Sequence, residues 1–218
     1  MTRPPLPNGT GGLSGSPAIT MRFFVIGSCR VHGPLSLAKG YSRGMSGYTH
    51  SAKEAIQHID LVNKIKTVPQ DISKFIFGRP EVEWQQRYSD DLNDADIVVV
   101  EIGTGKINEL NGWYLQSNYM TRFDDVPRGI STYDQSDLHD DIGRLKRMTK
   151  SLLVVQHIEL PGLAARSAFA NTLRLACADM GVPVYVPNFR TIDAYHYDPA
   201  DYRQIGQDIL NKAEKCLQ

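Results

Sequence analysis

The chain has 218 residues, with 24 basic and 24 acidic side chains and a formal net charge of zero. This length is enough for one domain with a sizeable core. The balanced charge argues against nucleic acid or a membrane surface as a partner, and the apolar runs are too short to cross a bilayer. Three widely spaced cysteines predict neither a disulfide framework nor a zinc site. We therefore expect a cytoplasmic protein without a bound metal.

The first twenty residues differ in composition from the rest of the chain. They are rich in Pro, Gly, Ser and Thr and lack the apolar centre of a signal peptide. Such a segment buries too little apolar surface to order itself. We expect residues 1–20 to be a flexible arm and residues 21–218 to form a single domain.

Within that domain, apolar runs alternate with segments of helical spacing. Strands are predicted at 23–27, 96–102, 151–156 and 183–186, with a weaker candidate at 73–77. Helices are predicted at 51–65, 81–93, 135–149, 163–180 and 200–216, and Ser51 with Glu54 matches a capping box at the first of these. This alternation predicts a doubly wound α/β fold, with a mostly parallel sheet flanked by helices.

The first strand ends in a short motif with two candidate nucleophiles. Phe23 to Ile26 form an apolar run that stops at Gly27, and Ser28 and Cys29 follow directly. Hydroxyl and thiol groups are common enzyme nucleophiles. The alternative interpretation is a tight turn that contains two small residues.

Ligands of doubly wound sheets bind at the carboxyl ends of the strands. There the later strands are followed by Thr104, Lys106 and Asn108, by His157, and by Asp193 and His196. Asp193 and His196 lie three residues apart before the last helix, which Pro199 can open, so the carboxylate could orient the imidazole. The alternative is a polar loop with helix-capping residues.

The two end motifs together resemble the SGNH, or GDSL-like, hydrolase superfamily. Its opening Gly-Asp-Ser and closing Asp-x-x-His read here as Gly27-Ser28-Cys29 and Asp193-Ala194-Tyr195-His196. The Gly-Ser-Cys opening is also similar to the GSCFA-type branch and to polysaccharide-biosynthesis acyltransferases with Gly-Asn-Cys at this position. The resemblance implies a flavodoxin-like three-layer sandwich and a triad of Cys29, His196 and Asp193, with Ser28 as the alternative nucleophile.

The resemblance also implies an oxyanion site, but here the sequence departs from the family. The backbone N–H of Gly47 is the expected first donor. The family's Gly-x-Asn-Asp is replaced by Gly103-Thr104-Gly105-Lys106, so Thr104 or Asn108 would have to replace the missing asparagine.

Other polar residues are candidates for the same pocket. Arg30 and Lys106 could hold a substrate carboxylate or a phosphate of coenzyme A, and His157 could line the pocket. His50 could face the site, and residues 111–123 could form a lid or pocket wall. The helix N-terminus and Arg30 predict a lowered pKa for the Cys29 thiol.

These observations favour an acyl-transfer enzyme that forms an acyl-thioester on Cys29 and passes the acyl group to an alcohol, an amine or water. No cofactor is required, although acyl-CoA or another acyl thioester could be the substrate. The expected partners are a small-molecule acyl donor and acceptor. Two alternatives stay open: a serine esterase that uses Ser28, and a non-catalytic SGNH-like binding domain.

Overall fold

The computed structural model describes residues 21–45, 47–80, 82–157, 164–189, 191 and 196–218. The predicted arm at residues 1–20 and the predicted triad member Asp193 lie outside the described residues. The flexibility of the arm and the role of Asp193 therefore stay predictions.

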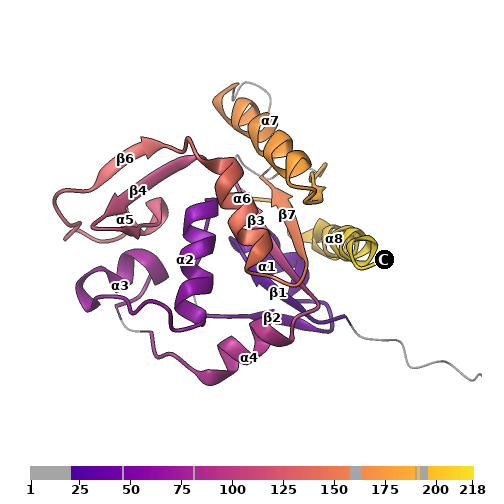
Figure 1. Ribbon diagram of the computed structural model, residues 1–218, viewed down its shortest axis with the longest axis horizontal. Coiled ribbons are helices and arrows are strands. Elements are labelled where there is room, and N and C mark those ends of the chain that lie inside the picture. The colour runs from indigo at the N-terminus through magenta and orange to yellow at the C-terminus, as the bar shows by residue number, and fades with distance from the viewer. Residues whose placement is uncertain (1–20, 46, 81, 158–163, 190, 192–195) are drawn as a thin grey trace, which may run out of the picture.

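Five parallel strands form the central sheet (Figure 1). Across the sheet they are β2 (Tyr41–Arg43), β1 (Phe23–Ile26), β3 (Ile97–Ile102), β7 (Leu152–Gln156) and β8 (Val184–Tyr185). The chain moves outward from β1 to β2 and then returns to the other side of β1 for β3. This order confirms the predicted doubly wound α/β fold and places its switch point between β1 and β3.

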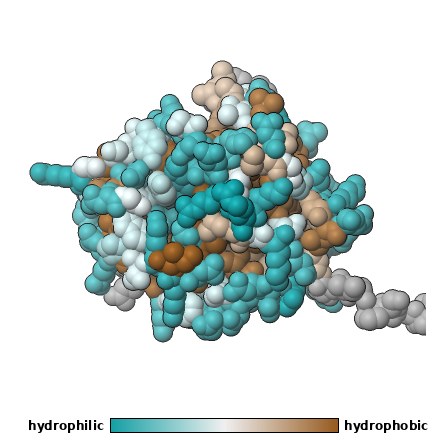
Figure 2. All heavy atoms as spheres, viewed as in Figure 1, coloured by the Kyte–Doolittle hydropathy of each residue, from teal (hydrophilic) through white to brown (hydrophobic). Residues whose placement is uncertain are grey.

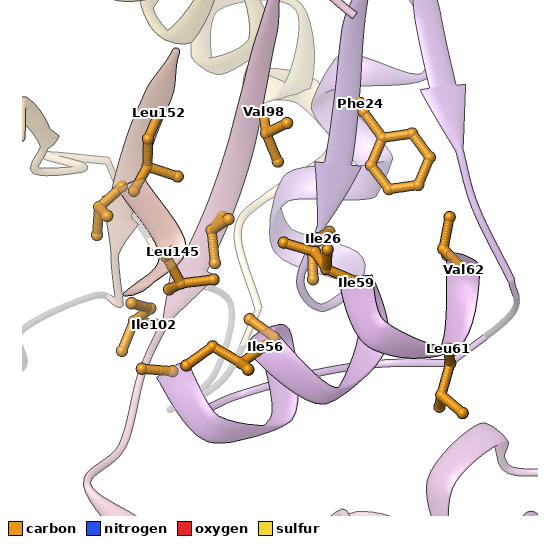
Figure 3. Packing of buried hydrophobic residues seen from close by; sticks show 14 of the residues in the cluster. Phe24, Ile26, Ile56, Ile59, Leu61, Val62, Val98, Ile102, Leu145 and Leu152 are labelled. Carbon is orange, nitrogen blue, oxygen red and sulfur yellow. The ribbon is translucent and has the colours of Figure 1, made fainter. Parts of the chain in front are cut away.

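Helices cover both faces of this sheet. One layer contains α2 (Ala52–Val62), α6 (Leu138–Arg147) and α7 (Ala164–Asp179), and the other contains α1 (Cys29–Leu35) and α8 (Tyr202–Cys216). Alternate strand residues point to opposite faces, so Phe24 and Ile26 join the α2 layer while Phe23 and Val25 join the α1 layer. Figure 3 shows Ile26 beside Ile59 of α2, with Phe24 further along β1 on the side of Val62. The result is a three-layer sandwich with two cores.

The helix α2 begins as its sequence predicts. Ser51 is its N-cap, and the Ser51 hydroxyl accepts a hydrogen bond from the N–H of Glu54. The Glu54 carboxylate accepts in return from the N–H of His50, one residue before the N-cap. The capping interaction therefore also ties down the residue that precedes the helix.

The prediction of a strand at 73–77 is wrong, because this segment belongs to α3 (Gln70–Phe77). Its buried residues Ile72, Phe75 and Ile76 follow helical spacing. Gly78 ends the helix with a φ of 73°, a left-handed conformation that glycine adopts readily. The β-type side chains of the segment concealed this helical period.

The remaining elements are short and lie beside the main sheet. They are α4 (Gln86–Asp94), α5 (Ser117–Met120), η1 (Pro199–Asp201) and an antiparallel sheet of β5 (Trp113–Tyr114), β4 (Lys106–Leu110) and β6 (Ser131–Asp134). This second sheet was not predicted. It is formed by the segment between β3 and α6, and its outer part extends from the main body of the molecule (Figure 1).

The surface seen in Figure 2 is mainly hydrophilic, with hydrophobic residues in small groups. Scattered apolar residues are usual on a globular surface. None of the helices in the described parts of the chain has the length and apolar character that a membrane span requires.

Candidate active site

A cleft of about 980 Å³ opens at the carboxyl ends of β1 and β3. Its walls include the predicted site residues Ser28, Cys29, Arg30, Thr104, Lys106, His157 and His196. These residues come from four separate parts of the sequence. The structure therefore brings most of the predicted site to one place, at the switch point where doubly wound folds bind ligands.

Cys29 is the first residue of α1, and Ser28 is the N-cap of that helix. The Cys29 side chain is partly exposed in the cleft, whereas Ser28 is only 2% exposed. The Ser28 hydroxyl accepts a hydrogen bond from the N–H of Arg30 at 3.3 Å. Of the two candidate nucleophiles, the hydroxyl is thus engaged in the helix cap and the thiol faces the cleft.

Beneath this turn lies Glu101, a buried carboxylate that the sequence reading missed. Its Oε2 accepts from the N–H and the hydroxyl of Ser28, at 2.8 and 2.5 Å. Its Oε1 accepts from Nε of Arg30 at 2.6 Å. The side chains of Glu101 and Arg30 are 1% and 7% exposed, so they form a buried ion pair. The signal in the sequence was a single acidic residue near the end of an otherwise apolar strand.

Strand periodicity explains why Glu101 reaches Ser28 and Arg30. Ile97 and Val99 of β3 face the layer that contains α1, and Glu101 is two residues further along the same face. Burial raises the pKa of Glu101, but Arg30, two neighbouring histidines and the Ser28 hydroxyl together lower it to about 2. Glu101 is therefore ionised at neutral pH and holds the start of α1 against β3.

The predicted lowering of the Cys29 pKa is wrong. Burial raises the pKa of the thiol above its ordinary value of 9.0, and the Glu101 charge adds to this effect. Arg30 lowers the pKa, but Glu101, to which it is paired, acts in the opposite direction. The thiol is consequently protonated at neutral pH and needs a base before it can attack.

Three histidines line the cleft with Cys29: His50, His157 and His196. His50 follows the loop after β2, His157 follows β7, and His196 precedes the last helix. A Cβ on Gly103 would lie 2.7 Å from the His157 ring, so the missing side chain at Gly103 lets the ring pack against the end of β3. Each histidine thus reaches the cleft from a different element.

Two of the predicted oxyanion residues do not line the cleft. Asn108 lies in the second sheet, where its amide donates to Ser117 and accepts from Thr132, both at 2.8 Å. Gly47 has a φ of +149° and packs against Ile76 and Phe77. Thr104 does line the cleft, and its hydroxyl accepts from the N–H of Lys106 at 3.0 Å.

The rim of the cleft carries more positive than negative side chains. Lys106, Arg122 and Arg166 line it, and Asp134 is the acidic residue among its described walls. The segment 117–122, within the predicted lid or wall, contributes Arg122 to this rim. Across the described residues, no three His, Cys, Asp or Glu side chains are grouped so as to hold a metal ion.

A second polar group lies behind the cleft, around Glu54. This carboxylate is buried, and its burial raises its pKa to about 7 despite the hydrogen bonds from His50 and Ser51. His58, one turn later on α2, is also buried, and its pKa falls to about 4. Both groups are therefore largely neutral in mildly acidic solution.

The first half of the chain is similar to part of a protein of polysaccharide biosynthesis. Residues 21–126 match the family described as the TviD N-terminal domain. Over 103 residues the chain is 33% identical to the Vi polysaccharide biosynthesis protein TviD of Salmonella typhi. The matched stretch covers 44% of this chain but only 12% of that protein, so the chain corresponds to a small part of its relative.

The matched range contains one part of the site and leaves out another. Cys29, Arg30, His50 and Glu101 lie within residues 21–126. His196 lies beyond it. The matched range therefore includes the Gly-Ser-Cys turn and the positions of Arg30 and Glu101, but not the closing Asp-x-x-His motif.

Proposed function

We propose that this chain is an acyl-transfer enzyme of polysaccharide biosynthesis that uses Cys29 as its nucleophile. The observation that carries the proposal is the placement of a partly exposed thiol in a cleft that three histidines also line. A nucleophile with a base nearby is the usual arrangement for covalent acyl transfer. The similarity to a Vi polysaccharide biosynthesis protein supports a saccharide as the acyl acceptor.

In this proposal the acyl group passes through a thioester. His196 takes the proton of the Cys29 thiol, and Asp193 orients the His196 ring. The thiolate sulfur bonds to the acyl carbon as the bond to the donor's leaving group breaks, and His196 gives its proton to that leaving group. A hydroxyl of the acceptor then attacks the thioester while neutral His196 takes the hydroxyl proton. The Cys29 sulfur leaves and receives that proton back from His196. The raised pKa of Cys29 supports a base-assisted rather than a preformed thiolate.

The cationic rim supports an anionic donor or acceptor. Lys106 and Arg122 line the cleft and form no ion pair with other described residues. They are suited to a phosphate of an acyl-CoA or to a carboxylate of the acceptor. Arg30 is less suited to this role because it is buried and paired with Glu101.

The test is covalent labelling by an activated ester, p-nitrophenyl acetate. Intact mass should show one added acetyl group, and peptide mapping should place it on Cys29. Cys29→Ala should abolish the adduct, whereas Ser28→Ala should retain it if it folds. Cys216→Ala is the matched control, since Cys216 is also a partly exposed free cysteine but lies outside the cleft. An adduct on Ser28, or an unchanged adduct in Cys29→Ala, would refute the assignment.

A further inference from the structure

The side-chain amide of Gln116 has an orientation that its neighbours determine. Its Oε1 accepts a hydrogen bond from the backbone N–H of Asn118, a group that can only donate. Its Nε2 must then face the other way, where it lies 2.8 Å from Nδ1 of His50. An amide nitrogen only donates, so Nδ1 of His50 is the acceptor. The proton of the neutral His50 ring is therefore on Nε2.

The backbone of His50 is fixed as firmly as its ring. Its N–H donates to Glu54 at 2.8 Å. Its carbonyl oxygen accepts from the N–H groups of Gly103 and Thr104, at 2.8 and 3.0 Å, directly after β3. The preceding residue, Thr49, donates its N–H to the carbonyl of Gly27 at the end of β1. His50 is thus attached to the ends of both strands that meet at the switch point.

The Nε2 edge of the His50 ring faces the cleft. Gln116 is 1% exposed, so the Nδ1 edge faces the protein interior, while the ring lines the same cleft as Cys29. Among the described residues, Nε2 has no hydrogen-bond partner. Burial lowers the pKa of His50, Glu101 raises it and Arg30 lowers it, with a net decrease. The ring is neutral at physiological pH and presents one N–H donor to the cleft.

We propose that His50 is an oxyanion donor: its Nε2–H binds the carbonyl oxygen of the acyl group that Cys29 attacks. This inference rests on the proposed function. It supplies the side-chain donor that the sequence lacks, since the segment after β3 has no asparagine in register and Asn108 is engaged elsewhere. A neutral donor held by hydrogen bonds on three sides needs no reorganisation as negative charge develops on the oxygen.

The chemistry of one acylation step shows how donor and base differ. With p-nitrophenyl acetate, a base takes the Cys29 proton, the C–S bond forms and the carbonyl oxygen becomes an oxyanion. The C–O bond then breaks and p-nitrophenolate leaves with its negative charge. His50 cannot be that base in its observed state, because its Nε2 already carries a proton and its Nδ1 accepts from Gln116.

The tautomer can be measured directly, without any substrate. Long-range ¹H–¹⁵N correlation spectra of histidine-labelled protein should show His50 protonated on Nε2 only at pH 7.5, with the His50→Gln spectrum providing the assignment. Gln116→Glu replaces the donor by an acceptor, and Nδ1 should then gain a proton. A wild-type ring protonated on Nδ1, or a spectrum unchanged by Gln116→Glu, would overturn the inference.

Kinetics test whether the donor acts on the reaction. His50→Ala should slow acylation by p-nitrophenyl acetate about 100- to 1000-fold with little change in KM. His50→Gln keeps an N–H donor but no base, and it should be at least about tenfold faster than His50→Ala. Equal losses in both variants would assign His50 as a base and overturn the inference.

Two further variants separate this inference from the proposed function. His139→Gln changes a half-exposed histidine of α6 outside the cleft, and its acylation rate should match the wild type. Undiminished acylation in Cys29→Ala would refute the proposed function while leaving the His50 tautomer as measured. A wrong tautomer with acylation still dependent on Cys29 would refute only the role of His50.

Discussion

Glu101→Gln should destabilise the protein far more than its small change in shape suggests. The glutamine oxygen can replace Oε2 and keep both bonds from Ser28, but its amide nitrogen then faces Nε of Arg30, donor against donor. The buried guanidinium then loses the negative charge of Glu101. Removing one partner of a buried ion pair costs about 3–5 kcal/mol.

The pKa of Glu101 gives an independent value for the same interaction. Its decrease from an ordinary 4.5 to about 2 corresponds to about 3 kcal/mol of stabilisation at neutral pH. Because the folded-state pKa is lowered, this stabilisation is present above pH 4.5 and is lost as the pH falls toward about 2. Glu101→Gln should remove that acid-dependent loss.

The measurement is urea unfolding at pH 7, followed by tryptophan fluorescence. We expect a loss of about 3–5 kcal/mol, or a fall in Tm of roughly 10 °C for a chain of this size. Asp94→Asn is the control, because it removes an exposed partner of Arg22 and should cost less than about 1 kcal/mol. If Glu101→Gln costs no more than Asp94→Asn, the interpretation of the ion pair is wrong. The double change of Arg30→Met with Glu101→Gln removes the buried charge and keeps an acceptor for both Ser28 bonds, so it should recover part of the loss.

Three further predictions concern groups around the cleft. Burial raises the pKa of Glu54 from 4.5 to about 7, so the wild type should lose stability as the pH rises through this range. Glu54→Gln should remove this loss and raise the free energy of unfolding by up to about 3 kcal/mol at pH 8, measured by urea unfolding. A lower free energy of unfolding for this variant at pH 8 would contradict the reasoning. Gly103→Ala places a Cβ 2.7 Å from the His157 ring and should lower the free energy of unfolding by about 1–3 kcal/mol. Gly143→Ala is the control: it lies inside α6 beside flexible side chains, and its free energy of unfolding should stay within about 1 kcal/mol of the wild type. Iodoacetamide should alkylate Cys29 with a pH midpoint above 9.0, because burial raises the thiol pKa; a midpoint near neutrality would show a preformed thiolate.

Four of the five strands of the central sheet could be predicted because they are apolar runs, whereas the edge strand β2 is short and polar and was missed. Strands such as β3 and β7 are buried throughout, so their composition identifies them without any alternation of polar residues. The segment 73–77 has similar side chains but belongs to a helix, and only the spacing of Ile72, Phe75 and Ile76 distinguishes the two. The second sheet escaped prediction because its strands are short and incompletely buried, and β6 is exposed along its whole length.

The candidate site was predictable in part for a related reason. Residues that directly follow strands, such as Cys29 and His157, reach the cleft because the topology brings strand ends together. Asn108 also follows a strand, but β4 begins at Lys106 and pairs away from the main sheet. The role of Glu101 depends on long-range pairing between β1 and β3, which local sequence patterns do not contain.

The ion pair between Arg30 and Glu101 also helps to explain why the Cys29 thiol is protonated. A free arginine beside Cys29 would favour a thiolate, but Glu101 binds this arginine and places a negative charge near the sulfur. The two charges shift the Cys29 pKa in opposite directions, and burial, the largest effect, raises it. The ion pair therefore fixes the start of α1 on β3. Glu101 binds Ser28 and Arg30, and Cys29 between them lines the cleft. Activation of the thiol must come from a separate base on the cleft side, and in the proposed reaction that base is His196.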